Sequence, residues 1–113
     1  SQLSVLETRR DQARATIRSA EGQLAASREQ LALIRQEEVM RRNLVNQGLA
    51  RLPELLALQR SRAGLEGQIV DLQGQITRAT AAIAEAESQI RATLDQRRQE
   101  VGTEAREVAA RRH

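Results

Sequence analysis

Apolar and small residues recur along this chain at alternating steps of three and four positions, and the repeat is interrupted once, between Asn43 and Pro53. Before the interruption, two interleaved heptad rows contain Leu3, Arg10, Ile17, Leu24 and Leu31, and Leu6, Ala13, Ala20, Ser27 and Ile34. After it, the rows contain Ile69, Ile76, Ile83 and Ile90, and Leu58, Leu65, Leu72, Ala79 and Ala86. This spacing places a narrow apolar stripe along one side of a helix, which is typical of a coiled-coil seam. We therefore expect two long helices that pack along such seams.

The interruption has the residues of a chain reversal. Gly48 can adopt the left-handed conformation that ends a helix, and Pro53 suits the first turn of the next helix. Glu54 then stands where a negative charge complements the helix dipole. The sequence predicts an all-α fold, a long antiparallel two-helix coiled-coil hairpin that forms one domain over residues 1–113. We expect its first helix at about 3–42, its tip at about 43–52 and its second helix at about 53–110.

Side-chain size predicts the register of the hairpin. Residues at equal distance from Gly48 should face each other, which places Ala20 opposite Ile76 and fills the seam by setting small residues against large ones. Arg62 then falls on the seam opposite Ile34, so its stem should lie along the seam while its guanidinium reaches Glu37 or Glu38.

The ends of the chain also carry helical pattern. We expect the sequence to be excised from a larger protein, and His113 to be a tag remnant instead of a ligand. The apolar row steps by four from Ile90 to Leu94 and resumes at Val101 and Val108, a stutter that locally unwinds a coiled coil. Residues beyond about 95 have no counterpart in the first helix, so they should project past it or pair with another molecule.

Composition supports an elongated helical fold over a globular one. The 113 residues include no aromatic residue and no Cys, and 40% are hydrophobic. The basic residues are all Arg, but the net charge is only +3 and both signs are mixed along the chain, so we expect no nucleic-acid binding. No apolar run approaches the roughly 20 residues that cross a bilayer, and no signal peptide is visible. Any membrane attachment should come through an N-terminal segment outside this sequence.

Catalytic and metal-binding patterns are missing. The sequence has no HExxH or CxxC spacing and no Gly-rich phosphate loop. Acidic pairs such as Glu37–Glu38 belong to helical charge patterns and are typical of a solvated face. We therefore expect no enzyme and no cofactor.

The outer face of the second helix carries small and uncharged residues where a solvated coiled coil is normally charged. Small residues let another helix approach closely, although glycine lowers helix stability by up to about 1 kcal/mol per residue. The face is either an exposed surface of low stability or a surface for lateral packing against other copies. The candidate lateral residues are Ala63, Gly67, Val70, Gly74, Thr77 and Ala81.

The tip is the other candidate site, because it combines apolar side chains with arginines and amides, as protein-docking surfaces do. The alternative is a turn whose Leu44 and Leu49 only close the end of the seam. The candidate partner-binding residues are Arg41, Arg42, Leu44, Val45, Gln47, Gly48, Leu49 and Arg51.

A resemblance bears on this choice. Residues 44–60, which read LVNQGLARLPELLALQR, resemble the hairpin tip of HlyD-like periplasmic adaptor proteins, also called membrane fusion proteins. Downstream, AEAESQI at 84–90, QRRQEV at 96–101 and EAREV at 104–108 resemble the following helix in the type I protein-secretion branch of that family. The likeness covers most of the chain from Gln30 onward.

The resemblance implies a hairpin that projects into the periplasm from a protein anchored to the inner membrane. It implies a self-associated adaptor, a hexamer, whose tips contact a TolC-like outer-membrane channel. Other parts of the protein, outside this sequence, would contact an ABC transporter. Efflux members of the family carry Arg, Leu and Ser at the tip, where this sequence has Met40, Leu44 and Arg51, so Leu44 and Gly48 are the better-supported channel contacts.

We interpret the chain as the hairpin of a type I secretion adaptor, and the helix that extends beyond Ile90 favours this over a drug-efflux adaptor. A different class of protein, a cytoplasmic structural coiled coil such as a scaffold or the arm of a chromosome-organising ATPase, remains an alternative. That alternative predicts charged outer faces and a tip that tolerates substitution.

Overall fold

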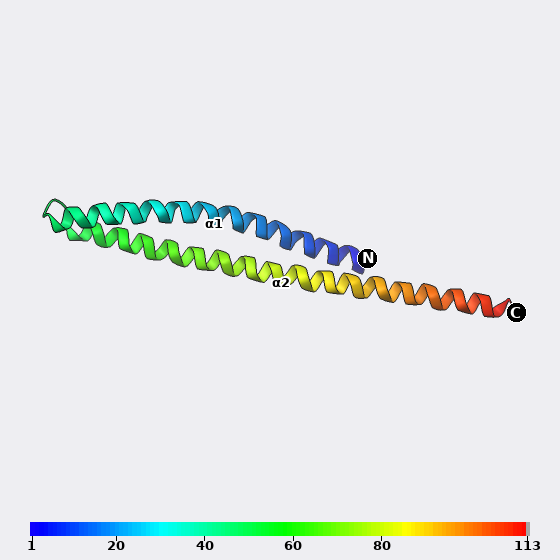
Figure 1. The fold of residues 1–113 in the computed structure, drawn as a ribbon. Helices are drawn as coiled ribbons and strands as arrows, with labels where there is room; N and C mark the ends of the chain where they lie inside the picture. Colours follow the sequence, from blue (N-terminus) through cyan, green and yellow to red (C-terminus); the bar gives the residue numbers. More distant parts are fainter. Residues whose placement is uncertain (113) are drawn as a thin grey trace. The chain divides into compact units, whose positions relative to one another are not determined.

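The computed structural model describes residues 1–112 and contains, over those residues, two α-helices and no strand. α1 spans Gln2–Asn46 and α2 spans Leu52–Arg111, and a single turn joins them (Figure 1). The all-α, two-helix hairpin is therefore confirmed. His113 lies outside the described residues, so the structure does not test the prediction that it is a tag remnant.

The chain divides into two compact units, and each is described by itself. The turn unit comprises residues 16–78 and contains the reversal. The terminal unit comprises residues 1–15 of α1 and the part of α2 that begins at Ala79. Neither described helix is long and apolar enough to cross a membrane.

Local hydrogen bonds explain where α1 begins and ends. The Ser1 hydroxyl accepts the backbone N–H of Ser4 at 3.3 Å, which caps the first turn of the helix. At the other end, the Gly48 N–H donates to the Val45 carbonyl at 3.0 Å and the Leu49 N–H donates to the Leu44 carbonyl at 2.8 Å. Together with the positive φ of 73° at Gly48, these two bonds form a Schellman motif. α1 thus continues to Asn46, beyond the expected end near residue 42.

α2 begins directly after this turn. The N–H of Glu54 donates to the carbonyl of Arg51 at 3.1 Å, and Pro53 occupies the first turn, where a missing N–H leaves no intrahelical bond unmade. Glu54 is the acidic residue of that first turn. The expected start at about 53 and the observed start at Leu52 differ by one residue.

The seam of the turn unit is filled by side chains from both helices. The half-buried side chains of Ile34 and Ile76 pack against its buried cluster. Ser27 is also buried on the seam. The cluster members are Ala20, Leu24, Leu31, Leu65, Ile69 and Leu72. All of them belong to the predicted heptad rows, so the seam positions are confirmed in this unit. The individual facing pairs stay a prediction.

The terminal unit has a seam of smaller residues. Leu6, Ala13, Ala79 and Ala86 are buried there. α2 runs on past the first residues of α1 (Figure 1), and from residue 95 to 112 every described side chain except Gly102 is exposed. The expected projection past α1 therefore agrees with the structure, while pairing of this segment with another molecule stays a prediction.

Candidate docking site at the turn

The apolar residues of the turn fall into a buried set and an exposed set. Leu55 is buried and Val45 is half-buried, so these two side chains close the end of the seam. Leu49 is 71% exposed and Leu44 is 37% exposed. Leu49 in particular contributes little to the seam, and the two leucines project apolar surface from a backbone that the Schellman bonds hold in place.

Two of the predicted tip arginines are engaged in ion pairs within the chain. Arg41 Nη1 lies 2.9 Å from Glu54 Oε2, which ties the last part of α1 to the first turn of α2. Arg42 Nη2 lies 3.6 Å from Glu38 Oε2. Both arginines remain about half-exposed, so each pair stabilises the fold by at most about 1 kcal/mol. Arg51 and Gln47 are exposed beside them, and the turn therefore surrounds its apolar residues with donors.

A buried carboxylate lies on the seam below the turn. Glu38 is only 8% exposed, and Arg62 Nε donates to its Oε1 at 2.9 Å. Arg62 Nη1 also donates to Glu66 Oε1 at 3.0 Å, and Arg35 Nη2 lies 3.7 Å from the same oxygen. The hydrogen bonds that Arg62 donates, the one to Glu38 having the largest effect and the one to Glu66 the next, raise the pKa of the Arg62 guanidinium above its ordinary value. Arg62 therefore stays charged. Of the two partners expected for Arg62, Glu37 and Glu38, its guanidinium contacts Glu38.

The position of Glu38 could have been found in the sequence. It follows Leu31 by one heptad and therefore continues the first row, but its charge hides it from a search for apolar residues. Its buried carboxylate is paired with both Arg62 and Arg42, and these partners matter because an unpaired buried charge is strongly unfavourable.

The outer surface of α1 also carries exposed apolar residues, which sequence reasoning missed. Leu33 is 53% exposed and Met40 is 62% exposed, and a shallow depression is lined by Arg35, Gln36, Val39 and Met40. These residues lie off the heptad seam, so the search for a seam passed over them.

The predicted lateral face of α2 is open where the structure describes it. Val70 is 64% exposed, and a Cβ added at Gly67 would meet no atom within 4 Å. A Cβ at Gly74 would lie 3.2 Å from Arg78 Nη1, the mobile end of a long side chain. Ala63 and Thr77 are exposed in the turn unit, and Ala81 is exposed in the terminal unit. A helix of a second molecule could approach the α2 backbone closely at this face. Such lateral packing stays a prediction.

Among residues 1–112, no group of three or more His, Cys, Asp or Glu side chains comes together in a way that could hold a metal ion. The groups displayed at the turn are apolar side chains, amides and charged side chains.

Comparisons with known proteins give one match. No curated protein and no solved structure matches the chain significantly. A family model described as "AprE, long alpha-helical hairpin" matches residues 1–113, the whole chain. This family is a structural hairpin of secretion adaptors and is not a family of enzymes. The HlyD-like family suggested by the tip sequence is a finer assignment that this match does not make. The chain therefore belongs to the AprE family of long α-helical hairpins, which are of the type I secretion adaptor kind.

Proposed function

We propose that this hairpin is the part of a HlyD-like adaptor that docks on a TolC-like outer-membrane channel during type I protein secretion. The observation that carries the proposal is the pair of exposed leucines, Leu44 and Leu49, held on a hydrogen-bonded turn within a chain of the adaptor family. The likeness of residues 44–60 to HlyD-like tips supports the same role.

Docking at this turn would use its rigidity. A preorganised surface loses little conformational entropy on binding, and the backbone of the turn is fixed by the Gly48 and Leu49 hydrogen bonds. Leu44 and Leu49 would enter apolar pockets of the channel. Gln47 and Arg51 would supply hydrogen bonds at the edge, as polar groups do around an interface core.

The rest of the proposed assembly follows from the adaptor role. The protein would be periplasmic and anchored to the inner membrane, with the ABC transporter contacted through parts outside this sequence. Self-association as a hexamer would place copies side by side, using the lateral face of α2. The mechanism is assembly of a passage, with no covalent step.

The structure favours the adaptor over a cytoplasmic structural coiled coil at one point. That alternative predicts charged outer faces, whereas the outer row of α2 at Ala63, Gly67 and Val70 is exposed and uncharged, although charged residues such as Asp71 stand beside it. For the drug-efflux alternative, Met40 and Arg51 stand where efflux adaptors carry Arg and Ser, so the tip lacks that pattern.

Aspartate substitutions in the gene, expressed in its native host, test the docking role. Leu44→Asp and Leu49→Asp should each abolish secretion into the medium, because a carboxylate cannot enter an apolar pocket without a large desolvation cost. Leu33→Asp is the matched control, since Leu33 is also exposed on α1 but lies away from the turn.

Far-UV circular dichroism of the purified variants should show unchanged helicity, which separates lost docking from lost folding. Normal secretion by both turn variants would remove the docking role. Equal loss in the Leu33→Asp control would show that the turn has no special part in secretion.

A further inference from the structure

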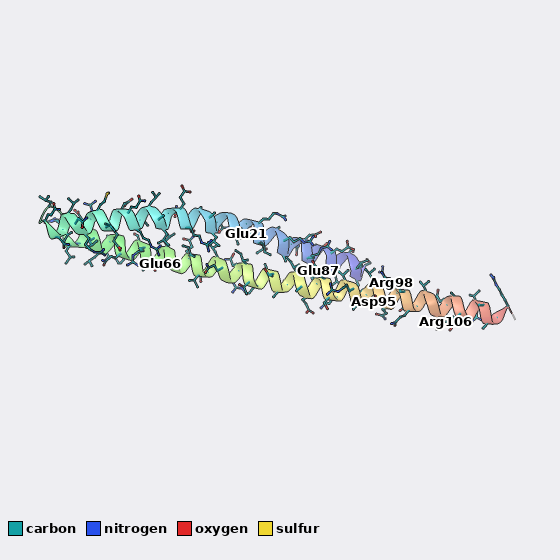
Figure 2. The ribbon with its side chains drawn as sticks, in the orientation of Figure 1. Glu21, Glu66, Glu87, Asp95, Arg98 and Arg106 are labelled. Atoms are coloured by element: carbon teal, nitrogen blue, oxygen red, sulfur yellow. The ribbon has the colours of Figure 1, made fainter. Side chains whose placement is uncertain are left out.

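The seam of the turn unit separates two flanks of different chemistry. The two flanks are defined from the seam row that contains Leu24 and Leu31 in α1 and Arg62 and Ile69 in α2. In a coiled coil, residues four positions after such a row lie on one side of the seam, and residues one position before it lie on the other side. Arg35 follows Leu31 by four positions and Glu66 follows Arg62 by four. Arg35 Nη2 and Glu66 Oε1 lie 3.7 Å apart, and Figure 2 labels Glu66 on α2. This contact shows that the positions after the seam row share one flank in both helices.

This first flank is charged. On α1 it carries one glutamate followed by three arginines, and on α2 it carries one glutamate, which pairs with an arginine of α1. The charged flank consists of Glu21, Arg28, Arg35 and Arg42 from α1 and Glu66 from α2. Gln59 and Gln73 are amides on the same flank of α2, so the contrast in charge between the two flanks comes mainly from α1.

The opposite flank is built from amides and a hydroxyl. We call it the amide flank, and it consists of Gln23 and Gln30 from α1 and Ser61, Gln68 and Gln75 from α2. All five side chains are exposed and none is charged. Charge appears on this flank at its end near the turn, at Glu37 and Glu54, and farther round α2 at Asp71 and Arg78.

The chemistry of the amide flank matches that of an unfolded polypeptide. A glutamine side chain offers the same N–H donors and C=O acceptor as a peptide bond, so it can contact backbone of any sequence. Such contacts exchange readily with those of water and hold a chain weakly. A charged or large apolar surface would instead retain the segments of opposite charge or high hydrophobicity.

Lateral packing decides which directions the flanks face. If copies stand side by side through the outer faces of their helices, the two flanks point to the inside and the outside of the assembly. We propose that the amide flank lines the passage and contacts the unfolded cargo polypeptide in transit, while the charged flank faces the surrounding water. This inference rests on the proposed secretion function.

Site-specific photocrosslinking tests the assignment. The photoreactive residue p-benzoylphenylalanine is placed at Gln75 on the amide flank or at Gln73 on the charged flank, two glutamines on one helix. The second pair, Gln30 and Arg28, repeats the comparison on α1. The cargo is identified as a secreted protein that disappears from the medium when the gene of this adaptor is deleted. A tagged copy of that cargo, fused to a rapidly folding domain that halts its export, serves as the probe.

Cargo adducts should be at least about fivefold more abundant from residue 75 than from residue 73, because crosslinking requires contact within about 4.5 Å. The same excess is expected for residue 30 over residue 28. Equal or greater adduct yield from the charged flank, no cargo adduct from either flank, or adducts from residue 75 to another copy of this chain would each overturn the inference. Failure of the secretion proposal can be told apart from failure of the flank assignment. If the secretion proposal is wrong, deleting the gene of this protein will leave every secreted protein in the medium.

Discussion

The same substitution, glycine to alanine, should have opposite effects at two positions of the turn unit. At Gly48 the backbone has a φ of 73°, a conformation that costs a residue with a Cβ about 1–2 kcal/mol. At Gly67 the backbone is helical, and alanine is favoured over glycine in a helix by about 1 kcal/mol. A Cβ at either position would meet no atom within 4 Å, so packing changes do not obscure the comparison.

We therefore expect Gly48→Ala to lower the free energy of unfolding by about 1–2 kcal/mol and Gly67→Ala to raise it by about 0.5–1 kcal/mol. Urea denaturation of the chain, followed by far-UV circular dichroism, measures both values. Gly48→Asn provides a graded control, because asparagine tolerates the left-handed conformation better than alanine. It should recover part of the loss.

The comparison also has a refuting outcome. A Gly48→Ala variant as stable as the parent chain would mean that the Schellman closure of α1 is not required for the reversal. An unchanged dependence of the unfolding free energy on urea would show that the same surface is exposed on unfolding in each variant.

Three further substitutions test other parts of the molecule. Leu72→Ala should lower the free energy of unfolding by about 2–5 kcal/mol, because it empties a buried seam position; a loss below about 1 kcal/mol by urea denaturation would contradict the seam. Glu38→Gln should cost about 1 kcal/mol, since a neutral amide accepts the Arg62 hydrogen bond more weakly than a carboxylate, and no measurable change would show that the ion pair is unimportant. Gly67→Arg should weaken lateral assembly without changing helicity; an unaltered sedimentation coefficient for the assembled adaptor would remove Gly67 from that interface.

The helices and their seam could be predicted from the sequence because one packing requirement repeats in every heptad. Leu24, Leu31, Leu65 and Leu72 each report the same periodicity, so no single residue decides the prediction. The end of α1 was harder to place, since it depends on two backbone hydrogen bonds at Gly48 that no periodic pattern records.

Features set by only one or two residues were missed or left open. Glu38 occupies a seam position, and its buried carboxylate is paired with the side chains of Arg62 and Arg42, whose reach the heptad pattern does not record. The exposed apolar residues Leu33 and Met40 lie off the two seam rows, so the seam pattern does not include them. The docking and lateral residues could be proposed from composition, but the partners proposed for them are other molecules, whose surfaces leave no trace in this chain's own periodicity.

The closure of the turn by main-chain hydrogen bonds separates the geometry of the reversal from the chemistry it displays. Only Gly48 must keep its residue type for the backbone to turn, because the bonds at Val45 and Leu44 use carbonyl groups that every residue possesses. The side chains at Leu49 and Arg51 are consequently free to vary. Adaptors of this architecture could exchange one outer-membrane partner for another through a few substitutions there, while the supporting rod stays intact.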